Sequence, residues 1–180
     1  MRKYLTVITG LAVLGGATAA FAAGNTASTT ADESTTIVRP ISSVKNTDLS
    51  FGTVVLPSSG SGTVTLSTAG ARSLTGTNAF WLASPTSTAA NFTISGEGGS
   101  AFTLAIDATD TLTNAGAGGG ALLVTTSNDA GCTSACALSG ASGDVTSGTL
   151  TFNVGVAFPI TSSTATGVYT GTLNVTATYN

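Results

Sequence analysis

The feature that most constrains this chain is a run of apolar residues that alternate with small or polar ones. From Leu150 to Phe158 every second residue is Leu, Phe or Val, with Thr, Asn, Gly and Ala between them. Side chains alternate between the two faces of a strand, so this pattern predicts a strand with one face in a core. Shorter alternations are Val64 and Leu66, Phe92 and Ile94, and Phe102, Leu104 and Ile106. Several short strands of this kind are typical of a β-sandwich.

The composition excludes several other classes of protein. Only 7% of the residues are charged and Gln is absent, so the usual residues of surface helices are scarce. The chain has no His, which excludes catalysis by imidazole and zinc sites built on it. The Lys and Arg residues number five, too few for a surface that binds nucleic acid or anionic lipid. We therefore expect an all-β protein that does not bind nucleic acid.

Residues 1–22 have the three parts of a secretory signal peptide. Arg2 and Lys3 are basic, residues 4–14 are apolar, and Ala20-Phe21-Ala22 precedes a cleavage site after Ala22. The apolar run is shorter than the ~20 residues that span a bilayer, which argues against a membrane anchor. We expect the mature chain to be exported without inserting into a membrane.

The mature chain divides into an extension and one domain. Residues 23–36 have almost no large apolar side chain and are expected to form a flexible N-terminal extension. The pattern changes at Ile37, and residues 37–180 are predicted to form a single β-sandwich domain. The apolar residues at its start flank Pro40, which predicts an edge strand because proline cannot donate to a central ladder; they are Ile37, Val38, Ile41 and Val44.

The two cysteines, Cys132 and Cys136, stand in a stretch rich in Gly, Ser and Ala. A metal site would need two more ligands, and no His is present to supply them. Export favours a disulfide instead. A loop this short predicts a stabilisation of only about 2 kcal/mol.

Other polar motifs suggest no catalytic chemistry. Gly116 to Gly120 lacks the Lys and the Ser or Thr of a phosphate-binding loop, which favours a hairpin tip. Four carboxylates are calcium candidates, but their spacing matches no known calcium loop and favours solvated turns; they are Asp107, Asp110, Asp129 and Asp144. No nucleophile has a neighbouring base. We therefore predict no catalytic, cofactor-binding or metal-binding residue, and no enzyme.

Five segments follow one another in an informative order: Leu49-Ser50-Phe51-Gly52, Gly70-Ala71-Arg72, Ala90-Asn91-Phe92-Thr93-Ile94-Ser95-Gly96, Val154-Gly155, and Gly167 to Asn180 with its penultimate tyrosine. Together they resemble a family of secreted bacterial domains of unknown function. That family is similar to the spore coat protein U type and to the archaic chaperone-usher pilins. The similarity covers about residues 37–180.

The resemblance implies an incomplete immunoglobulin-like β-sandwich that is completed by a donor strand and polymerises by donor-strand exchange. The partners that it implies are copies of the same chain, together with a periplasmic chaperone and an outer-membrane usher. It further implies that the protein reaches the bacterial cell surface or an extracellular fibre, such as a fimbrium, via the periplasm.

The C-terminal strand gives a physical reason to expect assembly. Exposed edge strands are usually protected by charge or proline, and residues 167–180 contain neither. We therefore expect a structural subunit of an extracellular fibre or surface layer that assembles by strand addition. The predicted polymerisation strand comprises Tyr169, Leu173, Val175, Ala177 and Tyr179, and the candidate donor residues are Ile37 and Ile41.

A second hypothesis is a monomeric secreted binding module, such as a carbohydrate-binding or adhesin domain. Trp81 beside Phe80 is its only candidate stacking platform. Aromatic pairs of this kind more often pack in a core. The size of the protein in solution distinguishes the two hypotheses.

Overall fold

The computed structural model describes residues 27–116, 118–140 and 148–180. The chain divides into two compact units, Met1–Thr36 and Ile37–Asn180. In the first unit, residues 27–36 are exposed and form no strand. The predicted signal peptide and residues 23–26 lie outside the described residues. Within the described ranges, no helix is long and apolar enough to cross a membrane.

The second unit is built from antiparallel strands, and its described residues contain no helix. The strands are β1 (Ser42–Thr47), β2 (Val54–Val55), β3 (Ser61–Leu66), β4 (Arg72–Leu74), β5 (Phe80–Trp81), β6 (Ala90–Gly96), β7 (Ala101–Ile106), β8 (Thr109–Asn114), β9 (Ala121–Asn128), β10 (Cys136–Ala137), β11 (Gly148–Thr161), β12 (Tyr169–Thr170) and β13 (Val175–Tyr179).

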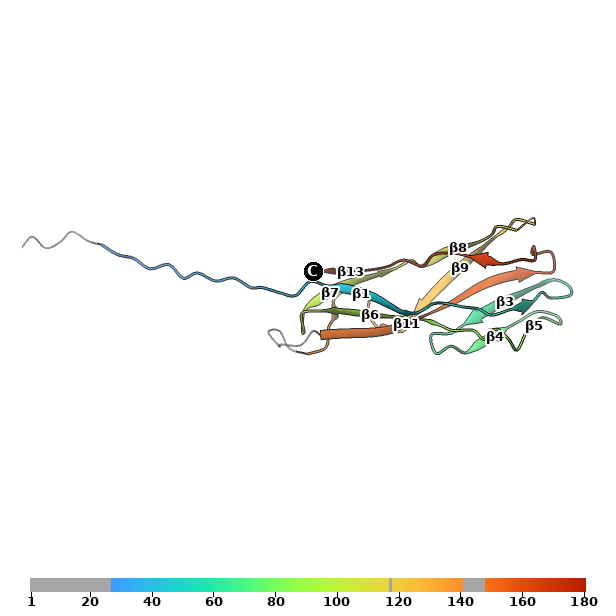
Figure 1. The fold of residues 1–180 in the computed structure, drawn as a ribbon, viewed down its shortest axis with the longest axis horizontal. Coiled ribbons are helices and arrows are strands. Elements are labelled where there is room, and N and C mark those ends of the chain that lie inside the picture. Colours follow the sequence, from blue (N-terminus) through green and yellow to red (C-terminus); the bar gives the residue numbers. More distant parts are fainter. Residues whose placement is uncertain (1–26, 117, 141–147) are drawn as a thin grey trace, which may run out of the picture. The chain divides into compact units, whose positions relative to one another are not determined.

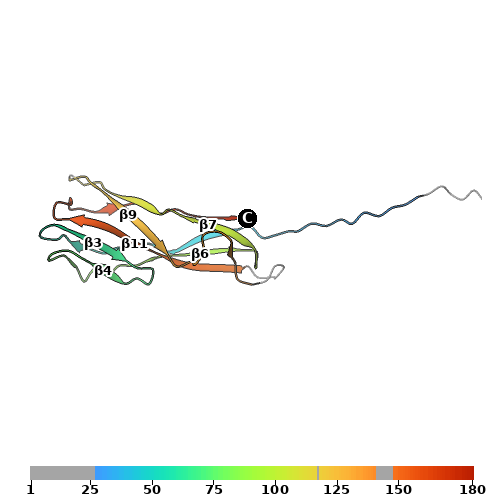
Figure 2. The same cartoon turned by 180° about the vertical axis from the view of Figure 1, so that it is seen from behind.

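The strands form three hydrogen-bonded sheets (Figures 1 and 2). The largest follows the order β1-β6-β11-β9-β8-β12, and β3 pairs with the second half of β11 and carries β4. A three-stranded sheet follows the order β10-β7-β13, and β2 pairs with β5. These curled antiparallel sheets form a β-sandwich. The predicted all-β fold class is therefore confirmed.

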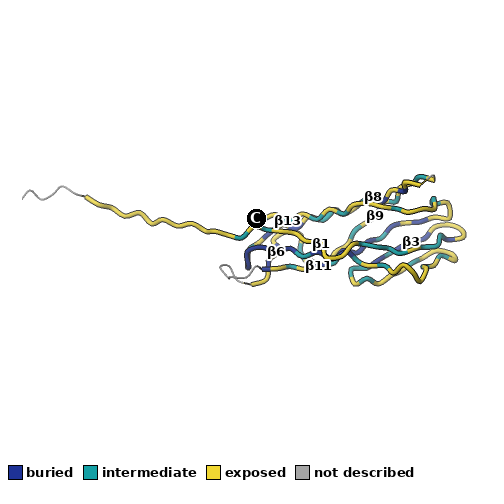
Figure 3. Tube along the Cα trace, viewed as in Figure 1, coloured by how far each residue is buried: buried dark blue, intermediate teal, exposed yellow. Residues whose placement is uncertain are grey.

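The long strand β11 connects two apolar cores (Figure 3). Phe152 and Val154 lie in the first core, and Val156, Phe158 and Ile160 lie in the second. The alternation predicted for this segment is confirmed, and full burial of such side chains contributes about 1.5–3 kcal/mol each. The strand runs on through Pro159 to Thr161, although the sequence, with its proline there, indicates a turn after Phe158. Beyond Ala157 it no longer pairs with β9, and proline is tolerated where a ladder is lost on one side.

The predicted C-terminal strand is divided in two. Its first part, β12, pairs with β8, whereas β13 pairs with β7 in the other sheet. Between β12 and β13, Asn174 is hydrogen-bonded to Asp107, which follows β7. The backbone N–H of Asp107 donates to the Asn174 carbonyl at 3.2 Å, and Asn174 Nδ2 donates to Asp107 Oδ2 at 2.8 Å. The C-terminal segment thus changes from one sheet to the other at the place where the chain passes from β7 to β8.

Candidate strand-binding groove

An open groove lies between an early segment of the domain, residues 45–56, and a late one, residues 164–173. Two adjoining cavities of about 560 and 490 Å³ form it. One wall is residues 45–56, which include the end of β1 and all of β2, and the other is residues 164–173, which include β12. The residues that line both cavities are Phe51, Gly52, Leu112, Val168 and Tyr169. The two cavities are therefore parts of one groove.

The floor of the groove combines buried apolar side chains with Asp110 and Thr126, which line the first cavity. Leu112, Val124 and Val156 line the first cavity, and Phe158 lines the second, and all four belong to the buried second core. Phe51 packs edge-on against Phe158, with 4.8 Å between the ring centroids. An apolar segment that filled this groove would therefore extend an existing core.

Backbone edges form the walls. Within the described chain, β1 pairs only with β6 and β12 only with β8, and no backbone hydrogen bond crosses the groove. Unpaired N–H and C=O groups on an edge are a template for another strand. Neighbouring strands alternate in direction from β1 to β12, so the two walls run antiparallel. A strand inserted between them would pair parallel with one wall and antiparallel with the other.

Gly52 shapes one wall at a turn between β1 and β2. Its φ of +70° lies in the left-handed region, and an added Cβ would lie 2.5 Å from the carbonyl oxygen of Pro85. Only glycine fits this position without strain. At the rim, Lys45 forms an exposed ion pair with Asp48, a kind of contact that contributes little to stability. The Leu49-Ser50-Phe51-Gly52 segment lies in the groove wall.

The predicted polymerisation residues face the interior of their own domain. Tyr169 packs against the second core, and the others pack against the first; these are Leu173, Val175, Ala177 and Tyr179. The exposed residues of β13 are Thr176 and Thr178. Tyr169 and Leu173 also line the groove, whereas Val175, Ala177 and Tyr179 do not.

The two candidate donor residues lie in different surroundings. Ile41 packs against the first core of its own domain, just before β1 begins at Ser42. Ile37 is 87% exposed and Val38 is 47% exposed. The edge strand expected from Ile37 onward begins later, because the backbone N–H of Arg39 donates to the Glu97 carboxylate instead of to a ladder. Of the two candidates, Ile37 is the one with an apolar side chain available to a partner.

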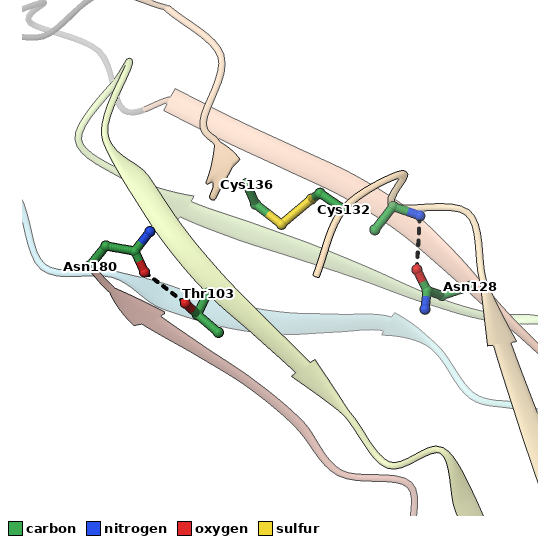
Figure 4. Close-up of a disulfide and its surroundings, with 6 residues drawn as sticks. Thr103, Asn128, Cys132, Cys136 and Asn180 are labelled. Carbon is green, nitrogen blue, oxygen red and sulfur yellow. Dashed lines mark hydrogen bonds between the residues drawn. A yellow bond between two sulfur atoms is a disulfide. The ribbon is translucent and has the colours of Figure 1, made fainter. Parts of the chain in front are cut away.

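The predicted disulfide between Cys132 and Cys136 is present (Figure 4). Cys136 is only 1% exposed and lies in the first core, where β10 pairs with β7. The backbone N–H of Leu104 donates to the Thr133 carbonyl at 2.9 Å, within the loop that the disulfide closes. The loop therefore covers the edge of β7 that faces away from β13.

The remaining polar candidates have structural surroundings. Asp129 accepts hydrogen bonds from the backbone N–H and Nδ2 of Asn153, at 2.5 and 2.9 Å, and Asp110 accepts one from the Thr111 backbone at 2.7 Å. Asp144 lies outside the described residues. No cluster of three metal-ligating side chains occurs in the part of the chain that is described. Gly116 and Gly118 to Gly120 lie between the paired strands β8 and β9, in the hairpin that the sequence predicts, and residue 117 lies outside the described residues.

The two neighbouring aromatic residues, Phe80 and Trp81, differ in burial. Trp81 packs partly buried against the second core, and the Arg72 guanidinium lies 5.1 Å from its ring centroid. Phe80 is 53% exposed. Trp81 thus contributes to packing, which leaves Phe80 as the accessible ring of the pair.

Among the comparisons with known proteins, only the comparison with protein families finds a match. No curated protein and no solved structure matches the chain. One family, described as Domain of unknown function (DUF4402), matches residues 41–179. The match spans the sandwich from Ile41, just before β1, to the last residue of β13. The chain therefore belongs to the DUF4402 family.

Proposed function

We propose that this protein is an exported structural subunit of an extracellular fibre or surface layer, and that its subunits join by strand addition. The observation that carries the proposal is the groove, which combines a largely apolar floor with two unpaired strand edges. Such a site fits an extended peptide, because the edges bind its backbone and the floor binds alternate side chains. The resemblance of the sequence to the spore coat protein U type and to the archaic chaperone-usher pilins also supports this proposal.

The proposed occupant is the N-terminal segment of a second copy. Residues 27–36 are exposed and form no strand, and Ile37 and Val38 add apolar side chains at their end. An extended strand rises about 3.3 Å per residue, so residues 27–38 would reach over about 40 Å as a strand. Because the donor and the groove are different segments of the chain, the contact is head-to-tail, and it generates an open polymer where the rotation between copies does not close a ring.

Two matched substitutions test the groove. Val168 is 78% exposed at the groove rim, whereas Leu123 is 60% exposed on β9 and does not line either cavity. Val168→Lys places a charge where the added strand would lie and should weaken assembly at least about tenfold, because a charge is costly to bury. Leu123→Lys should assemble as the unchanged protein does. Light scattering of the mature chain measures both.

Deletion of residues 23–36 tests the donor. We expect the deleted protein to remain β-rich by circular dichroism and to lose its polymers. A mature protein that stays monomeric at high concentration, with all three variants behaving alike, would contradict strand addition. That result would instead favour the monomeric binding module.

A further inference from the structure

An ion pair between the buried Glu97 and the partly exposed Arg39 lies beside the end of the last strand. Glu97 directly follows β6 and is only 4% exposed. Its Oε2 accepts hydrogen bonds from Arg39 Nη1 at 3.2 Å and from the backbone N–H of Arg39 at 3.4 Å. A buried carboxylate is costly unless it is paired and hydrogen-bonded. The pair therefore binds the chain just ahead of β1 firmly to β6.

Tyr179 joins this pair from the C-terminal strand. Its Oη accepts a hydrogen bond from the backbone N–H of Glu97 at 2.7 Å and donates one to the Arg39 carbonyl at 2.9 Å. Gly96 provides the room, because a Cβ at that position would lie 2.2 Å from Tyr179 Oη. One hydroxyl thus connects three segments, which are the approach to β1, the end of β6 and the end of β13.

These contacts lie at one end of the seam between the first and last strands. We define the seam as the line along which β1 faces β13 and, farther along, residues 45–56 face residues 164–173. Strands β1 and β13 lie side by side (Figure 1), yet among the described residues no backbone hydrogen bond joins them. The chain passes from Arg39 toward the groove along β1, and it returns from the groove to Tyr179 along β13. The seam is therefore held together at one end by side chains and open at the other.

We propose that Arg39, Glu97 and Tyr179 form a latch that keeps this end of the seam shut and sets where the groove ends. The latch deepens the proposed function and, as a limit on the added strand, rests on it. An added strand pairs with the walls at residues 45–56 and 164–173 and stops before the stretch where β1 faces β13. The three residues are positioning residues of the binding site rather than contacts of the bound strand.

Two neighbouring substitutions test the latch in the unassembled protein. Tyr179→Phe removes the bridging hydroxyl and keeps the ring, and Thr178→Val removes an exposed hydroxyl from the adjacent position of the same strand. Hydrogen–deuterium exchange of the mature chain, at a concentration where light scattering shows it to be monomeric and followed by mass spectrometry, reports on each segment. Tyr179→Phe should speed exchange about tenfold in residues 37–47 and 174–180, since two hydrogen bonds are lost there. Residues 121–128 of β9 should change less than about twofold, and Thr178→Val should change none of these segments.

Unchanged exchange at the seam in Tyr179→Phe would overturn the latch. Faster exchange spread equally over the whole domain would also overturn it, because that pattern marks a general loss of stability. A second variant, Glu97→Gln, keeps the side-chain size and removes the charge, and it should open the same two segments. These measurements use free protein, so they separate the failure of the latch from the failure of strand addition.

Discussion

At the scale of residues, Gly96 is a position that has no room for a larger side chain. Any larger residue would meet Tyr179 Oη at 2.2 Å and the Leu138 side chain at 2.9 Å. Neither neighbour can move freely, because Leu138 is 2% exposed in the first core and Tyr179 is held by two hydrogen bonds. Because Gly96 has no side chain, it leaves room for the Tyr179 hydroxyl.

Gly96→Ala should therefore lower the free energy of unfolding by about 1–3 kcal/mol, as expected for an overpacked site. The cost should be smaller in a Tyr179→Phe background, because the nearest remaining atom of that ring, Cζ, lies 3.2 Å away. Urea denaturation of the four proteins of this cycle measures the coupling. Equal costs in the two backgrounds would show that the hydroxyl does not determine the need for glycine.

At the scale of elements, the two sides of β7 in the three-stranded sheet have different partners. The disulfide loop holds β10 along one side of β7, and Thr103 Oγ1 donates to Asn180 Oδ1 at 2.7 Å on the side of β13 (Figure 4). The edge covered by the loop is not available to another strand, whereas the outer edge of β13 faces the seam.

The two cysteines should differ in their effect on stability. Cys132→Ser and Cys136→Ser both remove the disulfide, which should cost about 2 kcal/mol. Cys136→Ser also places a hydroxyl at a position that is 1% exposed, which should add about 1–3 kcal/mol. Urea denaturation of both variants under the same conditions measures the difference. If the two variants unfold at the same urea concentration, the buried position of Cys136 is irrelevant to stability.

Alternation in the sequence was enough to predict several of these elements. Phe152, Val154 and Val64 were assigned to a core face because period-two patterns reflect only local geometry. The division of the last strand was not predictable in this way, since it depends on the contact between Asp107 and Asn174, which are far apart in the chain. The groove and the latch were missed for the same reason. Glu97, a carboxylate among glycines, carries no sequence signal of burial.

At the scale of the whole molecule, the domain has an apolar core that reaches the surface between its first and last strands. A self-contained sandwich would pair these edges or protect them with charge or proline. Here one wall has no charged residue between positions 164 and 173. The proposed account is that the missing pairing comes from a second copy, and that polymer formation completes the sandwich.

Hydrogen–deuterium exchange at the groove walls tests this claim most directly. The measurement compares the assembled mature chain with the chain that lacks residues 23–36. The account predicts slower exchange on assembly in both residues 45–56 and residues 167–173, because one inserted strand pairs with both walls at once. Protection of neither wall, or protection confined to the exposed surface around Phe80, would contradict it.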